Sequence, residues 1–420
     1  MIQLLDEHIL TPETEKHFFT DQILPPLLQG ESLSIVKVPH SGVKFEMQFL
    51  INYASSLGFH KLGKYRFFYL GVNELIENNP EGFFQLFNQV LGNSGGFKKE
   101  TVSVFFEIKR KIKEYIEKNV HVIIIIGEFN RLNYPLTFFN NLQSLWQIGR
   151  DKIHFLFVVT QNIFGETSLP KFGELAELIT QNIIYFPLLS TSDSLFVVER
   201  LNKKYHYHVS ENKKKEIIKL AGGHPMLIRA CLRALSKLPT ATENELKDYL
   251  SQRFETKIIL EDIWKSLSQK EKIFLSTLIT IPKVFPENLD FLLKMRLIYQ
   301  EKGQNKLFSP LFETYLKSQK INESVLSLDK SGDILLNNQP VEEKITLYEY
   351  RLLTQFLQNP QKVITRDQIS EILWGKDSFQ KYSDWAIDQR ICFLRKKLKI
   401  LGISPNRLQT IKGRGYRWKA

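Results

Sequence analysis

Hydrophobic residues in the first half of the chain form short runs that do not alternate with polar residues. Such runs are typical of strands that are covered on both faces of a parallel sheet. Longer stretches with the apolar spacing of a helix, such as 101–118 and 137–148, lie between them. This alternation predicts an α/β domain built on a parallel sheet. The predicted strands are Leu33–Val38, Arg66–Val72, His121–Ile126, Ile153–Thr160 and Ile183–Leu188.

From about residue 192 to 253 the pattern is helical throughout. The segment 221–225, Ala-Gly-Gly-His-Pro, interrupts it, because Gly commonly follows the end of a helix and Pro commonly opens one. A further unit begins where Ser268 and Glu271 have the spacing of a capping box. A helix and then a hairpin turn at Gly303 follow, which is the outline of a small winged helix.

The last hundred residues show a similar outline with clearer boundaries. Two short strand patterns, 325–328 and 333–336, come first. Capping boxes that begin at Thr346 and Thr365 each open a helix, and residues 383–384 open a third. Three capped helices with flanking strands predict a second, compact winged-helix domain.

The third of these helices has one apolar stripe. Ile387, Ile391, Leu394 and Leu398 are spaced as neighbours on a single helix face, which we expect to face the domain core. A basic hairpin, 408–418, follows the helix, and its aromatic residues alternate with the basic ones. The aromatic side chains of the hairpin are therefore predicted to point inward.

Composition narrows the class of protein. The 420 residues are 43% hydrophobic and 24% charged, which is ordinary for globular domains and excludes a disordered chain. Two cysteines give no disulfide framework and favour a reducing cytoplasm. The longest aliphatic run, Val122–Ile126, is too short to span a bilayer, and the first residues lack the pattern of a signal peptide. We therefore expect a cytoplasmic protein without membrane segments.

Positive charge is concentrated at the end of the chain. The net charge of the whole sequence is +12, yet residues 385–420 alone hold ten Lys or Arg and one acid, Asp388. A basic helix fits the major groove of DNA, and a basic hairpin fits the adjacent backbone or minor groove. The predicted partner is double-stranded DNA, and the alternative is a winged helix that contacts proteins.

Side chains on the outward face of the last helix and on the hairpin are the candidate contacts. Lys and Arg at the edges of such a face suit phosphates, whereas its centre reads base edges. Gly413 and Gly415 allow a tight turn close to a phosphate backbone. The predicted DNA-binding residues are Gln389, Arg390, Phe393, Arg395, Lys396, Lys397, Thr410, Lys412 and Arg414.

Several motifs in order carry a resemblance to a known family. Leu347-x-x-Glu-x-x-Leu-Leu353, Leu373-Trp-Gly375, Leu394-Arg-Lys-Lys-Leu398 and Thr410-Ile-Lys-Gly-Arg-Gly-Tyr416 together resemble the OmpR/PhoB-type winged-helix DNA-binding domain. The resemblance implies that 384–399 is the recognition helix and 412–414 the wing.

The chain departs from this family in two respects. Phe393 stands where the family usually has a base-reading Arg, and Arg390 stands where it often has His. Phe can contact a thymine methyl group but cannot form the bidentate contact to guanine. The first half also lacks the acidic layout of a phosphoacceptor receiver domain, so we expect an input other than aspartyl phosphorylation.

A phosphate-binding loop is expected after the first strand, at Ile35–Phe45. Against the pattern G-x-x-x-x-G-K-[ST], Lys44 is present and Gly42 lies close to the second Gly. Val43 replaces that Gly and Phe45 replaces the hydroxyl that would bind Mg²⁺. A β-branched residue disfavours the positive φ that points amides at phosphate, so this loop is degenerate.

The third strand ends in a similarly altered motif. Gly127 stands where a metal-orienting Asp is expected, and Glu128 stands where a water-activating base would be. With the tip of the next strand, Thr160-Gln161, and the segment 222–225, this resembles the AAA+/STAND class of P-loop ATPases. The resemblance implies Lys44, Gly42 and Glu128 as candidate nucleotide-binding residues; no cofactor is required by the sequence, and ATP binding without efficient hydrolysis stays an open alternative. Lys44 and Glu128 also fit an exposed helix lysine and a strand-end carboxylate.

The predicted fold is therefore multidomain, with a P-loop NTPase-like α/β domain, a helical lid and two winged helices. The predicted boundaries are 1–190 for the degenerate P-loop domain, 191–255 for the lid, 256–320 for the middle winged helix and 321–420 for the OmpR/PhoB-type domain.

The sequence favours a DNA-binding transcriptional regulator that is not an enzyme and has no metal site. Its first half would serve as a sensor or an oligomerisation scaffold, and RNA polymerase and a second copy of the chain are further expected partners. One alternative is an active ATPase of the initiator or loader kind that acts on DNA. Another is a pure interaction scaffold, which the localised charge disfavours.

Overall fold

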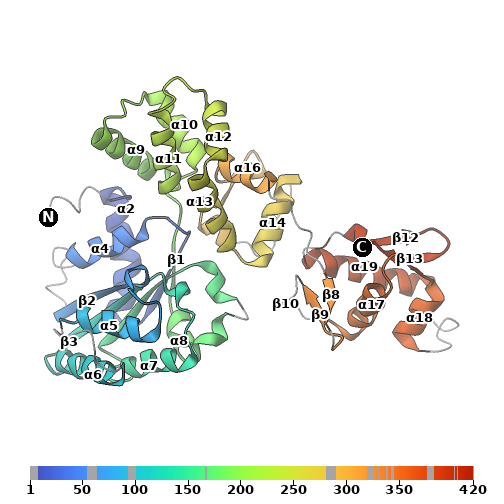
Figure 1. Ribbon diagram of the computed structural model, residues 1–420, viewed down its shortest axis with the longest axis horizontal. Coiled ribbons are helices and arrows are strands. Elements are labelled where there is room, and N and C mark those ends of the chain that lie inside the picture. Colours follow the sequence, from blue (N-terminus) through green and yellow to red (C-terminus); the bar gives the residue numbers. More distant parts are fainter. Residues whose placement is uncertain are drawn as a thin grey trace. The chain divides into compact units, whose positions relative to one another are not determined.

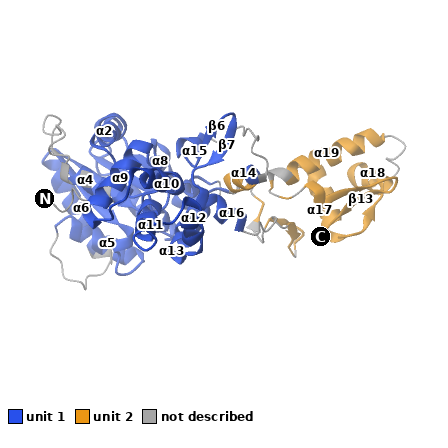
Figure 2. Cartoon of the chain, turned by 90° about the horizontal axis from the view of Figure 1, so that it is seen from above, with its two compact units in different colours: residues 1–268, 277–318 blue, residues 269–276, 319–420 orange. Residues whose placement is uncertain are grey.

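A computed structural model shows the architecture of the chain. It describes residues 8–53, 64–92, 101–165, 168–280, 290–318, 326–329, 331–336, 339–341, 345–375, 383–401, 403 and 405–419. These fall into two compact units (Figure 2). Unit 1 contains residues 1–268 and 277–318, and unit 2 contains residues 269–276 and 319–420.

A parallel sheet forms the centre of unit 1 (Figure 1). Its strands lie in the order β2-β3-β4-β1-β5, and every neighbouring pair is parallel. Every residue of β1 and β4 is buried, so both faces of these strands are covered. All five predicted strands and the predicted parallel sheet are confirmed. The strands are β1 (Leu33–Lys37), β2 (Lys64–Gly71), β3 (Val120–Gly127), β4 (Ile153–Val159) and β5 (Ile183–Phe186).

Helices connect these strands, and aromatic residues fill the space between helices and sheet. Phe83 and Phe138, from two different helices, pack edge to face with ring centroids 5.0 Å apart. The helices are α2 (Pro12–His17), η1 (Phe18–Ile23), α3 (Leu24–Leu28), α4 (Val43–Tyr53), α5 (Pro80–Val90), α6 (Thr101–Glu117), α7 (Leu136–Trp146) and α8 (Leu175–Thr180). Short 3-10 turns are η3 (Val72–Glu74), η4 (Phe129–Arg131), η5 (Gln161–Phe164) and η6 (Leu169–Phe172).

Five helices follow the sheet, as the sequence predicts. α10 ends at Ala221, Gly222 caps it in the left-handed conformation with φ +57°, and α11 begins at Pro225. A Cβ atom at Gly222 would lie 2.0 Å from the carbonyl oxygen of Phe308, so only glycine fits there. These helices are α9 (Thr191–Tyr205), α10 (Glu211–Ala221), α11 (Pro225–Leu235), α12 (Glu243–Gln252) and α13 (Phe254–Lys265).

The predicted hairpin at Gly303 is also present. β6 and β7 pair antiparallel, and the turn places Gly303 at φ +75°. The division into units falls within α14, whose residues 269–276 group with unit 2. The elements here are α14 (Gln269–Thr280), α15 (Asp290–Lys294), β6 (Ile298–Glu301), β7 (Gln304–Leu307) and α16 (Pro310–Ser318).

In unit 2, the described residues between 326 and 419 form the helices α17, α18 and α19 and two small sheets around one core. The capping boxes at Thr346 and Thr365 are both formed, as predicted. The sheets have the orders β10-β9-β8 and β11-β13-β12. The elements are β8 (Leu326–Leu328), β9 (Ile334–Leu336), β10 (Gln339–Pro340), α17 (Leu347–Gln358), β11 (Val363–Ile364), α18 (Arg366–Trp374), α19 (Asp384–Ile400), η8 (Pro405–Arg407), β12 (Leu408–Ile411) and β13 (Gly415–Trp418). None of the helices formed by the described residues is both long and apolar enough to cross a membrane.

Candidate functional sites

The loop between β1 and α4 occupies the position of a phosphate-binding loop. Its left-handed residues are His40, with φ +59°, and Gly42, with φ +84°. Val43 is the first residue of α4, so the positive φ falls on the neighbouring Gly42 and not on Val43. A Cβ atom at Gly42 would lie 2.7 Å from Cδ1 of Ile9, because the N-terminal segment passes over this turn. The side chain of Phe45 lies outside the described part of the structure.

A pocket of about 470 Å³ opens beside this loop in unit 1. It brings together the three predicted nucleotide-binding residues, Gly42, Lys44 and Glu128, with Thr160 from the end of β4. A volume in this range suits a drug- or nucleotide-sized ligand. Seven cationic side chains line it, against two acids, Glu128 and Asp262. The cations are Lys37, Lys44, Arg131, Arg200, Lys204, Arg229 and Lys265.

Glu128 does not face the pocket as a free carboxylate. Its Oε1 atom lies 2.7 Å from Nζ of Lys37, whose side chain is only 5% exposed, and its Oε2 atom lies 3.7 Å from Nε of Arg131. Glu128 itself has φ +58°, an uncommon conformation for a residue with a side chain. A water-activating base needs an available lone pair, and here a buried ammonium group occupies one oxygen.

The fold class implies a bound Mg²⁺ ion at this position, but the side chains do not fit one. Gly127 provides no side-chain oxygen, and a Cβ atom there would lie 2.3 Å from the hydroxyl oxygen of Tyr69. Mg²⁺ prefers carboxylates and phosphate oxygens in octahedral geometry. The one carboxylate at this strand end, Glu128, is already paired with Lys37.

Two histidines connect the loop to helices of the second half of unit 1. Nε2 of His224, at the start of α11, donates to the carbonyl oxygen of Pro39 at 2.9 Å, and Nδ1 accepts from the amide of Leu227. Complete burial lowers the pKa of His224 to about 4, so the ring is neutral at pH 7. His40 contacts Asp262 of α13 across 2.7 Å. The sequence indicated only helix punctuation at His224 and gave no sign of these contacts.

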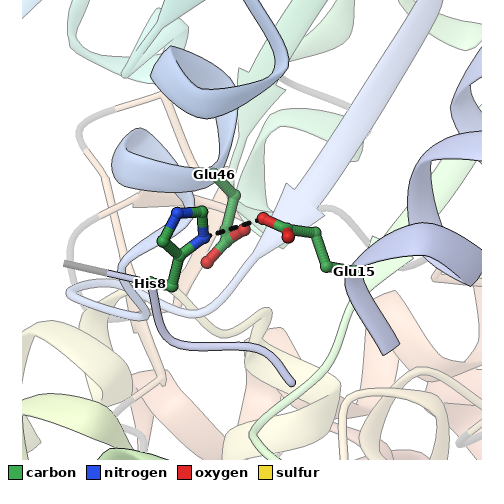
Figure 3. Close-up of side chains that lie close together, drawn as sticks. All are labelled: His8, Glu15 and Glu46. Atoms are coloured by element: carbon green, nitrogen blue, oxygen red, sulfur yellow. Dashed lines mark hydrogen bonds and ion pairs between the residues drawn. The ribbon is translucent and has the colours of Figure 1, made fainter. Parts of the chain in front are cut away.

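A buried polar cluster holds the N-terminal segment against α4 (Figure 3). Nδ1 of His8 lies 2.9 Å from Oε1 of Glu15, and the amide of Ile9 donates to Oε1 of Glu46 at 3.0 Å. The ligand atoms of His8, Glu15 and Glu46 lie within 4.8 Å of one another, so this is the candidate cation site among the described residues. Burial, reinforced by the Glu15 carboxylate, raises the pKa of Glu46 to about 8, which favours a bound proton at neutral pH.

In unit 2, α19 packs its predicted apolar stripe into the core. Ile387, Ile391, Leu394 and Leu398 are each at most 3% exposed. The aromatic residues of β13, Tyr416 and Trp418, are buried against the same core, as predicted. Four basic residues of the helix and hairpin are exposed, namely Lys396, Lys412, Arg414 and Lys419, whereas Arg390, Arg395, Lys397 and Arg417 are partly buried.

The outward face of α19 combines an apolar ring with positive charges. Phe393 is 50% exposed, and Nζ of Lys396 lies 5.6 Å from the centre of its ring. The guanidinium of Arg390 stacks 4.5 Å from the ring centre of Tyr348 on α17. Lys397 lines the same shallow pocket as these residues. This arrangement gives a rigid apolar centre with cations around it.

Arg395 has a structural role that the sequence did not reveal. Its Nε and Nη2 atoms donate to the carbonyl oxygen of Leu408 at 3.1 and 2.7 Å, and Nη2 also donates to Oγ1 of Thr410 at 2.8 Å. Arg395 thus joins α19 to the first strand of the hairpin. Its predicted contact with DNA stays a prediction, and any substitution there will also disturb the hairpin.

The hairpin turn presents two exposed cations. β12 and β13 pair antiparallel up to Ile411 and Gly415, and the turn between them holds Lys412 and Arg414, both exposed. A Cβ atom at Gly415, where φ is +133°, would lie 2.1 Å from the carbonyl oxygen of Ile364. Glycine at this position therefore allows β13 to pass close to β11.

Asp388, the acid within the basic segment, is neutralised by its neighbours. Its Oδ1 atom lies 2.7 Å from Nη2 of Arg366 and accepts a hydrogen bond from the Tyr416 hydroxyl. Burial alone would raise the pKa of Asp388, but the hydrogen bonds from Tyr416 and Arg366 lower it overall. The outer surface of α19 is therefore more uniformly positive than the sequence suggests.

Residues 341–418 match the family model described as "Transcriptional regulatory protein, C terminal". Residues 341–418 of unit 2 are thus similar to the C-terminal domain of transcriptional regulatory proteins and are called the regulator domain below. The match spans α17 to β13, so the apolar stripe of α19 and the hairpin turn both lie within this regulator domain.

Two curated relatives align with the chain over similar lengths. The alkaline phosphatase synthesis transcriptional regulatory protein SphR of Synechococcus elongatus is 42% identical over 69 residues, which are 16% of this chain and 26% of SphR. The uncharacterized transcriptional regulatory protein YclJ of Bacillus subtilis is 39% identical over 92 residues, 21% of this chain and 37% of YclJ. The chain thus spans about a third of the length of these relatives.

Among solved structures, the ORC2 protein of Aeropyrum pernix, in its ADPNP and ADP complexes, aligns with 75% of this chain and 97% of its own length. The sequence identity is 12% and the TM-score is 0.42.

Proposed function

We propose that the chain is a DNA-binding transcriptional regulator whose regulator domain binds duplex DNA through α19 and the β12–β13 hairpin. The proposal rests on the difference between the two sides of α19. One side is fully packed in the core, whereas the other places cations around the half-exposed Phe393. Asp388 lies within this basic surface but is paired with Arg366, so it adds little repulsion toward phosphate.

The proposed contacts follow from position on this surface. Lys396, Lys397, Lys412 and Arg414 would hold phosphates, because their charges lie at its edges. Gln389, Arg390 and Phe393 would approach base edges. Arg395 and Thr410 would contribute mainly by fixing the hairpin relative to α19, since they are hydrogen-bonded to each other.

The wing cations provide the sharpest test of DNA binding. The double variant Lys412→Ala/Arg414→Ala should lose at least about tenfold affinity for mixed-sequence duplex DNA and about two units of the slope of log K against log salt, because each phosphate contact releases about one counterion. A gel-shift titration of the full chain at several salt concentrations measures both. Lys302→Ala, in the β6–β7 turn of unit 1, is the matched control. Unchanged retention and slope in the double variant would refute the proposal.

Unit 1 would act upstream of the regulator domain, as a sensor or an oligomerisation scaffold. We infer domain boundaries at 1–190, 191–255, 256–320 and 321–420, with RNA polymerase and a second copy of the chain as further partners. A ligand-sized pocket in a fold that ends in a DNA-binding domain supports the sensor role.

We further infer that unit 1 does not hydrolyse ATP efficiently. The missing oxygen at Gly127 and the pairing of Glu128 with Lys37 remove the groups that would organise a metal and a water. Phosphate release from Mg·ATP should therefore be the same for the natural chain, Lys44→Ala and Glu128→Gln. Turnover that is lost in both variants would favour the alternative, an ATPase of the initiator or loader kind.

A further inference from the structure

The pocket of unit 1 has an excess of positive charge and lacks a place for a metal ion. Its seven cationic side chains come from the sheet, from α4, from α9, from α11 and from α13, so they converge from several elements. In metal-dependent nucleotide sites, a divalent ion neutralises much of the phosphate charge. Here the lining cations that are not paired with glutamates, among them Arg229, would provide that neutralisation.

We propose that this pocket binds a nucleotide-sized phosphate ester without a divalent cation, and that the Lys37 ammonium acts as the permanent counter-ion of Glu128. This inference does not depend on DNA binding by the regulator domain. It departs from the Mg²⁺-bound ligand that the fold class implies, because the side chains at the end of β3 do not fit a metal.

Lys37 is suited to this role by its burial and its distance from Glu128. Its ammonium lies 2.7 Å from the carboxylate, and its side chain is 5% exposed, whereas that of Glu128 is 26% exposed. A metal ion that binds the Oε1 atom of Glu128 would have to displace a nearly buried ammonium group. Loss of one partner from such a pair leaves an uncompensated buried charge, so the pair should persist.

The phosphate end of the ligand would lie near Lys44 and the cations of the helices opposite. Lys44 is paired with Glu74 across 2.8 Å, but both side chains are more than 40% exposed, so this pair is weak and can rearrange. Lys204 of α9 and Arg229 of α11 both lie near the ring of Tyr205, and Arg229 donates to its hydroxyl at 3.0 Å. A phosphate group bound between these residues and Lys44 would join the sheet to the helices.

The remaining lining suits the organic part of the ligand. Ile9, Val197, Leu201 and Met226 provide apolar surface, and Ile9 belongs to the segment that passes over Gly42. An apolar wall beside a cluster of cations matches a ligand with a flat organic ring and a phosphate tail. Inorganic phosphate alone would leave this wall unused.

Calorimetric titration of the full chain with ATP and with ADP tests the proposal, first in EDTA and then with excess Mg²⁺. We expect binding in EDTA that Mg²⁺ does not tighten, because Mg²⁺ and the cationic side chains compete for the same phosphate oxygens. Lys204→Ala/Arg229→Ala should weaken metal-free binding at least about tenfold, whereas Lys203→Ala, from the adjacent exposed position of α9, should not. Absence of binding of both probes to the folded chain, binding that requires Mg²⁺, or full binding by the double variant would overturn the proposal.

Two further variants test the proposed role of Lys37. Lys37→Met should leave Glu128 with only the longer contact to Arg131, so that metal-free binding weakens and added Mg²⁺ now tightens it. The double variant Lys37→Met/Glu128→Gln replaces both charges by neutral groups of similar size, and it should bind ATP in EDTA and remain insensitive to Mg²⁺. This second variant keeps the test decisive if Lys37→Met does not fold. Mg²⁺-dependent binding by the double variant would contradict the assignment of Lys37.

Discussion

Replacing Leu394 by alanine is expected to destabilise the regulator domain by about 2–5 kcal/mol and to weaken its proposed binding to DNA. Leu394 is fully buried in the core cluster that α19 shares with α17, α18 and β13. Truncation of a buried leucine to alanine costs about 2–5 kcal/mol. Whole domains are stable by only about 5–15 kcal/mol, so this loss removes a large part of the stability of a domain of this size.

Hydrogen exchange of the full chain measures this effect locally. Peptides from 347–418 should lose protection in Leu394→Ala, while peptides from the sheet of unit 1 keep theirs, because the substitution lies in unit 2. Phe393→Ala is the matched control, since the adjacent Phe393 is half-exposed and outside the core. If Leu394→Ala keeps natural protection across α19, then the assigned core is wrong.

Glu46→Gln is expected to stabilise unit 1 at neutral and alkaline pH. The folded state raises the pKa of Glu46 from 4.5 to about 8, mainly through burial, so the folded chain keeps a proton that the unfolded chain releases. This difference lowers stability as the pH rises from 4.5 toward 8, by about 1.4 kcal/mol per pH unit. Glutamine mimics the protonated form, so the gain near pH 7.5 should be about 4 kcal/mol.

Two buried histidines make the fold less stable as the pH falls, which is the opposite of the effect of Glu46. They therefore limit the pH range in which the effect of Glu46 can be measured by itself. Burial lowers the pKa of His154 and of His224 to about 4, so protonation of the unfolded state below about pH 6.5 destabilises the fold. Above that pH, Glu46 alone among these three changes stability. The comparison is therefore best made between pH 6.5 and 8.

Urea unfolding in EDTA across this range provides the test. The midpoint of the natural chain should fall with rising pH, and that of Glu46→Gln should stay level. Glu117→Gln, at the exposed end of α6, serves as the control. Parallel pH profiles for the natural chain and Glu46→Gln would show that Glu46 holds no proton. Stabilisation of the natural chain by added Zn²⁺ would show that the cluster with His8 and Glu15 binds a metal ion instead.

The elements of the fold could be predicted where their signals are local in sequence. The central strands β1, β3 and β4 are recognisable because a strand buried on both faces needs a continuous apolar run, and the edge strands β2 and β5 have similar runs although they are only partly buried. The capping boxes at Thr346 and Thr365 were recognisable because both partners lie within one helical turn. The stripe from Ile387 to Leu398 follows from helix geometry alone.

The decisive contacts of the candidate sites could not be predicted, because their partners are distant in sequence. Lys37 and Glu128 meet only because β1 and β3 end at the same edge of one sheet. From the sequence alone, Arg395 is predicted to contact phosphate. Only the fold shows that its guanidinium group donates to the carbonyl oxygen of Leu408. The sequence shows which residues are charged, but only the fold shows which group each charged side chain contacts.

The close approach of Tyr69 to Gly127 also constrains how this chain can evolve. A change of Gly127 to aspartate would introduce a Cβ atom 2.3 Å from the Tyr69 hydroxyl oxygen, so the ring of Tyr69 would have to move or be replaced as well. Lys37 would in addition compete with any metal for Glu128. A metal ligand at this position therefore requires more than the change of Gly127 to aspartate alone. The present form of the pocket is accordingly a state that single mutations do not reverse.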